Sequence, residues 1–457
     1  MTYLEFLDRK TQFGQPTGFD PTDLPGHLFK FQHDLVAWAL QQGRAAIFAD
    51  CGLGKTPMEL AWADQIHSRT HKPVLLLTPL AVGFQIVREA TKFGHNAAIS
   101  RDGAITAPIT VTNYEQLDKF NPDNFGGAVC DESSAIKAFD GQRRALVTEF
   151  LRRMPYRLLG TATAAPNDYI ELGTSSEAIG QLGYMDMLNR FFVNDNRTSD
   201  TGRGGKWNLS AGGFRFKGHA QQPFWRWVSS WARAIRKPSD YGYDNNGFIL
   251  PPLEHRVTVV EPRNAHPDHL FDIPAVGLPE EREETRRTLT ERCETAANIL
   301  TDAQPGIAWC NLNDESALLT KLIDGAVELT GSDTLDDKES KLRAFSDGDI
   351  RVLVTKPKLG AFGLNWQHCH RMTYFPTHSY EQYYQAVRRC WRFGQQHPVT
   401  VDVVTTPGGR RTLDNLQRKA KAADEMFDQL LENMQGALNI NRTNPFTLPM
   451  ETPAWLS

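Results

Sequence analysis

Two short clusters of residues follow apolar runs and have the side-chain types that phosphate chemistry needs. The run 45–49 leads into Asp50-Cys51-Gly52-Leu53-Gly54-Lys55-Thr56, and the run 128–130 leads into Asp131-Glu132. The first cluster places glycines and a lysine where a buried strand turns into a helix, so backbone N–H groups can surround phosphates. The second places two carboxylates at a strand end, where one can hold Mg²⁺ and the other can orient water. Together they predict a nucleoside-triphosphatase site, although Ala49 stands where such loops usually have their first glycine.

The elements that must position these clusters form two series of short strands. The runs of the first series are apolar rather than alternating and are separated by helical patterns, which is typical of a parallel sheet covered on both faces. The second series indicates a second α/β domain. The first series contains the runs 45–49, 74–78, 109–112, 128–130 and 157–160. The second contains the runs 256–260, 307–310, 326–329, 352–355, 372–375 and 399–405. Only the first series includes a phosphate loop, so we expect two α/β domains with a nucleotide between them.

The composition limits the remaining possibilities. A chain of 457 residues is too long for one ordinary core and predicts two or three domains. The formal net charge is −4, so any nucleic-acid surface must be local. The six cysteines are scattered without a C-x-x-C pair, which favours a reducing cytoplasm. The longest apolar stretch is far too short for a membrane span, and we expect no membrane partner.

The chain between the two series has a different composition. Residues 201–239 contain no Asp or Glu, while Arg and Lys accumulate beside aromatic residues. Pro223 and Pro238 are expected to bound a helix. On a helical projection the aromatic residues form one face, which we expect to be core, and Arg226, Arg233 and Lys237 lie on or near the opposite face. This basic face predicts a phosphate-backbone contact, and a merely solvated face is an equal alternative.

These patterns give an expected division of the chain. It comprises an N-terminal extension (1–23), a first domain (24–175), a helical basic-aromatic insertion (176–250), a second domain (251–410) and a C-terminal helix and tail (411–457). The mixed-charge stretch 280–294 predicts an exposed helix, and the amphipathic stretch 413–434 predicts one or two helices packed on the second domain.

The most specific motif lies in the second domain and reads Gln385-Ala386-Val387-Arg388-Arg389-Cys390-Trp391-Arg392-Phe393-Gly394-Gln395. It resembles the final motif of superfamily-two helicases of the DEAD/DEAH type, and within them of Swi/Snf-type translocases, Q-A-x-x-R-x-x-R-x-G-Q. Other segments between residues 28 and 395 follow the order of this family, and the resemblance implies two tandem RecA-like domains. These segments are Phe31-Gln32, Thr78-Pro79-Leu80, Thr112-Asn113-Tyr114-Glu115, Gly160-Thr161-Ala162-Thr163 and Gly360-Ala361-Phe362-Gly363-Leu364-Asn365.

The resemblance implies ATP and Mg²⁺ as cofactors and a role for each matching residue. Catalytic roles fall on Lys55, which neutralises phosphate charge, on Asp131 and Glu132, and on Arg392 as an arginine finger with Arg389 beside it. Thr56 and Asp131 are expected to hold Mg²⁺, and Glu132 to polarise the attacking water. The nucleotide is expected to contact Gln32, Gly52, Gly54, Lys55, Thr56 and Gly363. Coupling to nucleic acid is expected of Thr78, Thr112, Tyr114, Thr161, Thr163, Asn365 and Gln385, together with Arg226, Arg233 and Lys237.

The sequence also departs from the family in places. The acidic box continues as Ser133-Ser134 rather than Ala-His or Ala-Asp, so the rules of RNA helicases do not transfer to it. The stretch 374–377 lacks the Asp and Trp-Asn-Pro usual in chromatin remodellers. The compact length is more similar to helicases encoded by bacteriophages and prophages. That similarity implies the cytoplasm of a bacterium or phage-infected cell, with phage or host replication or recombination proteins as partners.

Three functions are compatible with these residues. The first is an ATP-dependent translocase or helicase that moves along DNA, duplex rather than single-stranded, by closing and reopening the cleft between its domains. The second is an RNA helicase. The third is an ATP-gated clamp or loader that binds nucleic acid without travelling along it.

Overall fold

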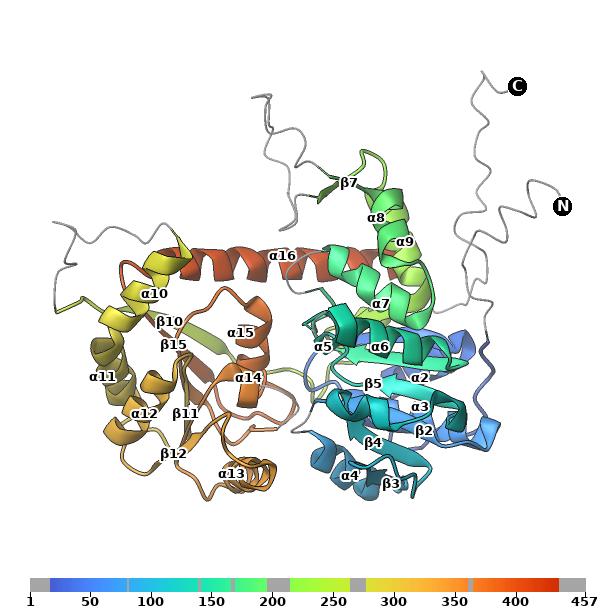
Figure 1. Ribbon diagram of the computed structural model, residues 1–457, viewed down its shortest axis with the longest axis horizontal. Coiled ribbons are helices and arrows are strands. Elements are labelled where there is room, and N and C mark those ends of the chain that lie inside the picture. Colours follow the sequence, from blue (N-terminus) through green and yellow to red (C-terminus); the bar gives the residue numbers. More distant parts are fainter. Residues whose placement is uncertain are drawn as a thin grey trace.

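The computed structural model describes residues 17–79, 82–138, 141–165, 169–194, 214–263, 277–360 and 365–434. Its two lobes stand side by side, each built on a large parallel sheet (Figure 1). The first lobe contains the seven-stranded sheet and the second contains the six-stranded sheet. The predicted fold class is confirmed: the chain is an α/β protein with two large parallel sheets. Among the described residues no helix is long and apolar enough to cross a membrane.

The sheet of the first lobe has the order β3-β4-β2-β5-β6-β1-β9, and its paired strands are parallel. Five of its strands coincide with the predicted apolar runs, namely β1 (Arg44–Ala49), β2 (Val74–Thr78), β4 (Ile109–Asn113), β5 (Gly127–Cys130) and β6 (Tyr156–Thr161). Two strands were not predicted, β3 (Ala97–Ile99) and β9 (Ala232–Ile235). Both are edge strands too short to show a pattern of their own.

Helices cover both faces of this sheet because side chains alternate along each strand. In β1, Ala46 and Phe48 join one apolar cluster, whereas Ala45, Ile47 and Ala49 join the other. The second cluster includes residues of α2 (Lys30–Gln42), α3 (Lys55–Thr70) and α4 (Gly83–Lys92). The first cluster includes residues of α6 (Gly141–Arg152), α7 (Leu172–Ile179), α8 (Tyr184–Phe191) and α9 (Gln221–Trp231). The shorter elements of this lobe are η1 (Tyr114–Lys119), η2 (Pro122–Asn124), α5 (Ala135–Ala138), η3 (Tyr169–Glu171), η5 (Pro238–Tyr241) and the antiparallel pair β7 (Phe192–Asn194) and β8 (Phe214–Phe216).

The basic-aromatic segment is built into the first lobe. Its aromatic residues Phe224, Trp227 and Trp231 are buried, as predicted. The expected helix up to Pro238 is wrong, however, because α9 ends at Trp231 and the chain continues as β9, which pairs with β1. The expected insertion 176–250 therefore supplies an edge strand and a core helix to the first sheet.

The sheet of the second lobe has the order β10-β15-β14-β11-β13-β12, and its paired strands are also parallel. All six strands overlap the predicted runs: β10 (Leu253–Val259), β11 (Gly306–Trp309), β12 (Ala326–Leu329), β13 (Val352–Thr355), β14 (Arg371–Tyr374) and β15 (Val399–Thr405). One face packs against α11 (Leu289–Ile299) and α12 (Asn313–Leu322). The opposite face packs against α13 (Leu335–Asp347) and α15 (Tyr380–Val387), near the short helix α14 (Pro357–Gly360).

The stretch 280–294 is not the single exposed helix that its mixed charges predict. It forms α10 (Leu278–Arg287) and the start of α11, with Thr288 between them. Its charged residues are partly internal: Arg292 and Glu315 form an ion pair of 2.7 Å with side chains only 6% and 0% exposed. The sequence pattern could not show this partner, because Glu315 lies on another helix.

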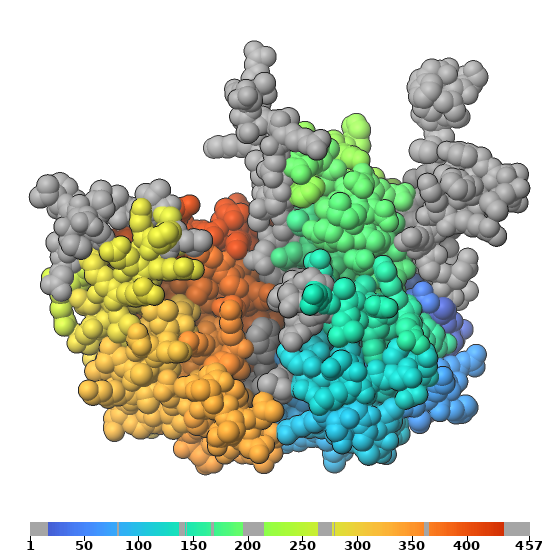
Figure 2. All heavy atoms as spheres, in the orientation of Figure 1, coloured from blue at the N-terminus to red at the C-terminus, as the bar shows by residue number. Residues whose placement is uncertain are grey.

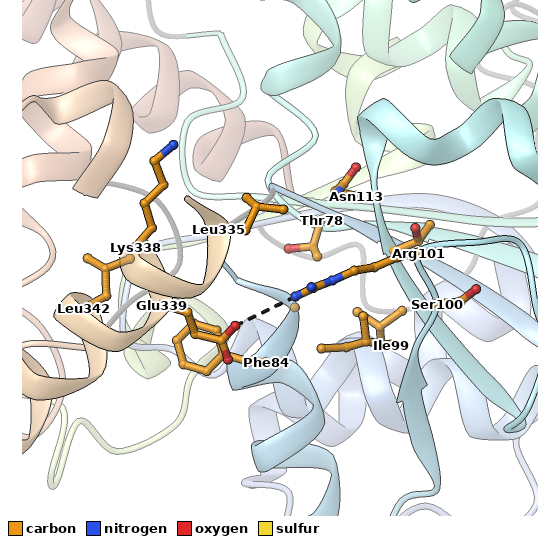
Figure 3. A pocket seen from close by; sticks show the side chains of 13 residues that line it. Thr78, Phe84, Ile99, Ser100, Arg101, Asn113, Leu335, Lys338, Glu339 and Leu342 are labelled. Carbon is orange, nitrogen blue, oxygen red and sulfur yellow. Dashed lines mark ion pairs between the residues drawn. The ribbon is translucent and has the colours of Figure 1, made fainter. Parts of the chain in front are cut away.

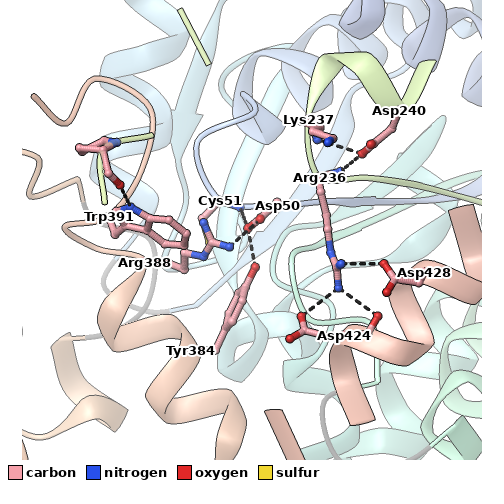
Figure 4. Close-up of polar contacts among 11 residues, drawn as sticks. Asp50, Cys51, Arg236, Lys237, Asp240, Tyr384, Arg388, Trp391, Asp424 and Asp428 are labelled. Atoms are coloured by element: carbon pink, nitrogen blue, oxygen red, sulfur yellow. Dashed lines mark hydrogen bonds and ion pairs between the residues drawn. The ribbon is translucent and has the colours of Figure 1, made fainter. Parts of the chain in front are cut away.

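The C-terminal helix α16 (Arg410–Met434) crosses both lobes (Figure 1). Its first half contributes Leu416 to the core of the second lobe, and its second half contributes Met426, Phe427 and Leu430 to the core of the first. The expectation that this region packs on the second domain is therefore incomplete. Arg236, just after β9, binds Asp424 at 3.0 Å and Asp428 at 2.9 Å (Figure 4).

The packing of α16 on the first lobe generates a stability prediction. Phe427 is 6% exposed, and the Arg236 guanidinium lies 4.6 Å from the centre of its ring. Phe427→Ala should lower the free energy of unfolding by about 3 kcal/mol, because it leaves a cavity in the core. Lys421→Ala, at an 80% exposed side chain of the same helix, is the control and should change it by less than about 0.5 kcal/mol. Equal melting curves for the two variants would contradict the packing of α16 into the core of the first lobe.

Candidate active site

The predicted phosphate loop turns between the end of β1 and the start of α3. Gly54, the residue before the helix, has a left-handed conformation (φ 77°). Because glycine has no side chain, no side chain caps the first N–H groups of α3. Such a helix N-terminus can receive phosphate oxygens. Gly52 (φ 89°) lies against the second lobe, and a Cβ atom there would meet the Phe393 nitrogen at 2.5 Å. Both positions therefore require glycine, for conformation and for space.

Gln32 supports this loop from behind. Its side-chain amide donates to the Leu53 carbonyl at 2.8 Å and accepts from the Phe29 N–H at 3.0 Å. The side chain is buried and lies outside the set of residues that line the cleft described below. An amide retains a second N–H and a second lone pair, so contact with adenine stays a prediction.

The acidic pair follows β5 and faces the loop. Glu132 has φ 47°, a left-handed conformation that is rare for a residue with a side chain and is concentrated at functional sites. Its carboxylate lies 3.3 Å from the Lys55 ammonium. The Asp131 carboxylate accepts a hydrogen bond of 3.0 Å from the Thr78 hydroxyl. The two predicted halves of the site are thus in direct contact.

Burial and mutual charge perturb the pKa values of these groups. Burial, with the added charge of Glu132, raises the pKa of Asp131 to about 7. Burial alone would raise the pKa of Glu132, but Lys55 and Arg389 outweigh it, and that pKa is lowered. Burial alone would lower the pKa of Lys55, but Glu132 together with the other acidic groups around it outweighs burial, and that pKa is raised. The ionic forms of Lys55 and Glu132 therefore stabilise each other, whereas Asp131 lacks a full countercharge.

A divalent cation would supply the positive charge that Asp131 lacks. Asp131 and Thr56 line the same cleft, and carboxylate and hydroxyl oxygens are ligands that Mg²⁺ prefers. Within the described part of the chain, no group of three or more His, Cys, Asp or Glu residues could hold a metal ion. The expected Mg²⁺ would therefore depend on phosphate oxygens and water for its remaining ligands, as is common for this ion.

The second lobe completes the cleft through α15 and the turn that follows it. The Gln385 amide donates to Glu132 at 3.4 Å and accepts from Arg389 at 2.8 Å. Arg389 and Arg392 both line the cleft, and burial together with Arg389 lowers the pKa of Arg392 to about 10. One cleft thus brings together residues of both lobes: Asp50, Cys51, Gly52, Gly54, Lys55, Thr56, Pro57, Val82, Gln85, Glu89, Asp131 and Glu132 from the first, and Asn365, Arg389 and Arg392 from the second.

Two of the predicted coupling residues, Thr161 and Tyr114, contact the acidic pair, and a third, Thr163, contacts α15. The Thr161 hydroxyl donates to Glu132 at 3.4 Å, and the Thr163 hydroxyl donates to Glu381 of α15 at 3.5 Å. Tyr114 is buried, and its hydroxyl donates to the Asp131 carbonyl at 2.8 Å. Tyr114 can therefore influence the acidic pair, but it lies too deep to touch nucleic acid in this conformation.

A groove between the lobes contains two further predicted residues. Thr78 and Thr112, at the ends of β2 and β4, line it on one side, and Leu335, Lys338 and Leu342 of α13 line it on the other (Figure 3). An ion pair of 3.9 Å between Arg101 and Glu339 spans the two lobes here. Figure 2 shows the orange surface of the second lobe meeting the blue surface of the first at this edge.

The predicted basic face is only partly correct. Arg226 and Lys237 are exposed, but Arg233 is 4% exposed and lies in β9. Its guanidinium donates to the Ala232 carbonyl at 3.0 Å and lies 4.2 Å from the centre of the Trp38 ring. The helical projection placed Arg233 on the surface because it assumed a helix where the chain forms a strand. Gly363 lies outside the described residues.

Asp50 and Arg388 lie within two of the motifs, but no role was predicted for either residue. They form an ion pair of 2.7 Å between the phosphate loop and the residue that directly follows α15, with both side chains largely buried. The pair could have been suspected from the sequence only because the two residues have opposite charges and lie in the two most specific motifs. Gln85 and Glu89 of α4 also line the cleft and are hydrogen-bonded to each other at 2.9 Å.

The chain matches no protein-family model and no curated protein sequence. Among solved structures, it is similar to the Sulfolobus solfataricus SWI2/SNF2 ATPase core in complex with dsDNA. That similarity covers 92% of this chain and 96% of the other, with 15% sequence identity and a TM-score of 0.41.

The burial of Arg233 generates a prediction that separates packing from surface charge. Arg233→Met should lower the free energy of unfolding by about 2–3 kcal/mol, because backbone carbonyls that now accept from a cation lose their donor. Arg226→Met, on the exposed face of α9, is the matched control and should stay within about 0.5 kcal/mol of the parent protein. Thermal denaturation of both variants is the measurement, and an unchanged Arg233→Met would show that this guanidinium is solvated after all.

Proposed function

We propose that this chain is an ATP-dependent DNA translocase similar to the Swi/Snf type, which couples ATP hydrolysis to movement along duplex DNA. The observation that supports the proposal most directly is the single cleft lined by the phosphate loop and acidic pair of one lobe and by Arg389 and Arg392 of the other. Such a division of residues makes hydrolysis depend on the relative position of the lobes.

Each residue of the cleft has a role that follows from its chemistry. The N–H groups at the start of α3 and the Lys55 ammonium would bind the β- and γ-phosphates of ATP. Asp131 and Thr56 would hold Mg²⁺, which supplies charge compensation for the phosphate oxygens. Glu132, with its lowered pKa, would orient the attacking water and accept its proton. Arg392 would stabilise charge that develops in the transition state.

The groove supports a nucleic-acid path next to this cleft. Thr78 contacts Asp131 and also lines the groove, so one side chain joins the two sites. Arg101 and Lys338 could contact phosphates at the same place. Arg226 is carried by α9, at the opposite end of the molecule from α13 (Figure 1), so it would belong to a separate contact. For that reason we assign the main DNA path to the groove.

The proposal is tested by comparing nucleic acids. Duplex DNA should stimulate ATP hydrolysis more than single-stranded DNA or RNA, and ATP should drive displacement of a third strand from a triplex. Glu132→Gln is the control: it should retain ATP and lose hydrolysis by a factor on the order of 10²–10⁴, because the base is removed while the shape is kept. Displacement should disappear with it.

The same assays distinguish the alternatives. Stimulation by RNA above either form of DNA would favour an RNA helicase. Unwinding of a tailed duplex without triplex displacement would favour a strand-separating helicase. Hydrolysis stimulated by DNA without movement in either assay would favour a clamp or loader. We also propose that the protein associates with phage or host replication or recombination proteins. Co-purification from an infected bacterium would test this association.

The arginine finger generates a further prediction. Arg392→Ala should leave ATP affinity within a few-fold of the parent protein and lower the turnover number by about 10³–10⁵, because the lost interaction is made in the transition state. Arg392→Lys retains the charge without the planar fork and should recover only part of the loss. A variant with weakened affinity and normal turnover at saturation would instead identify Arg392 as a binding residue.

A further inference from the structure

The phosphate loop contains a buried carboxylate, Asp50, beside the place proposed for an anionic ligand. Asp50 is 7% exposed, lines the cleft and follows the last residue of β1. Its Oδ1 accepts from the Cys51 N–H at 2.6 Å and from the Tyr384 hydroxyl, and its Oδ2 pairs with Arg388 at 2.7 Å (Figure 4). Two of these three partners come from the second lobe.

Arg388 is held in position by aromatic rings of its own lobe. Its guanidinium lies 4.3 Å from the centre of the Trp391 ring and 5.0 Å from that of Tyr384. The Trp391 indole N–H donates to the Pro251 carbonyl at 2.7 Å, which fixes the ring to the chain that connects the lobes. The Arg388 and Asp50 side chains are 13% and 9% exposed, so water screens their interaction little.

Arg388 differs in position from the two arginines assigned to catalysis. Arg389 and Arg392 line the cleft, whereas Arg388 and Tyr384 reach it through Asp50. A bare carboxylate in the phosphate loop would repel a triphosphate, and in a buried site that repulsion is strong. Arg388 cancels this charge only while the second lobe is docked on the loop.

We propose that Arg388 and Tyr384 are positioning residues that neutralise Asp50 and thereby make the nucleotide affinity of the phosphate loop depend on docking of the second lobe. The inference rests on the proposed nucleotide site and adds a second link between the lobes, separate from the arginine finger. Opening of the lobes would expose the phosphates to the Asp50 carboxylate and favour release of the nucleotide. Docking would favour its retention.

The test is a double-mutant cycle on the full chain with mant-labelled ATP as the binding probe. Arg388→Met should weaken binding and raise KM by about 10- to 100-fold, with kcat within about threefold, because a buried carboxylate is left uncompensated. Adding Asp50→Asn to Arg388→Met should restore KM to within about threefold of the parent protein, since the amide keeps the shape and removes the charge. Arg236→Met is the control: it removes another arginine that forms ion pairs between elements, here between α16 and the first lobe, and should leave KM unchanged.

Thermal melting of each variant shows whether it is folded. The restoration of KM in the double variant can be measured even if one of the variants is less stable than the parent protein. A double variant as weak as Arg388→Met, or an Arg388→Met variant with normal KM, would overturn the inference. The measurement needs no nucleic acid, so a parent protein that binds mant-ATP without moving on DNA would overturn the translocase and leave this test valid. A parent protein that does not bind mant-ATP would overturn both.

Discussion

The two lobes are organised around the buried charge of Glu132. Its carboxylate contacts Lys55 of its own lobe and the Gln385 amide of the other, and Arg389 lowers its pKa from the second lobe as well. A buried charge is tolerated only when it is paired and hydrogen-bonded. Because part of this compensation comes from α15, the protein loses favourable interactions whenever the lobes separate. The chemistry of the site and the position of the lobes are therefore linked by the same contacts.

The helix α16 sets a second constraint, because it is anchored in both cores. Leu416 belongs to the core of the second lobe, and Phe427 and Leu430 belong to the core of the first. A continuous helix transmits displacement along its length, so the lobes cannot separate freely while both anchors hold. Motion of the kind that a translocase needs would then be a rotation about α16 or a local release of one anchor, with Arg236 at the end that binds the first lobe.

The sequence predicted the elements that a local residue pattern defines. It did not predict the elements that form only through contacts with distant parts of the chain. The inner strands β2, β13 and β15 are buried along their whole length because both of their faces are covered, and their mainly apolar runs were located to the residue. In contrast, β9 follows a Trp-rich helix and has no pattern of its own; it becomes a strand only because β1 offers a free edge. Arg233 was misplaced for this reason. Likewise, the pairing of Asp50 with Arg388 depends on how two lobes dock, which no spacing in the chain encodes.

The pairing of β1 with β9 also explains why Ala49 stands where phosphate loops usually have their first glycine. Ala49 is the last residue of β1 and pairs in parallel register with Ile235 of β9, so its backbone is extended and needs no glycine. The left-handed turns fall later, at Gly52 and Gly54. The added edge strand thus lengthens the regular part of β1, and the next residue, Asp50, donates its N–H to the Ile235 carbonyl at 2.9 Å. The strand that sequence patterns missed is therefore what holds Asp50 where α15 can reach it.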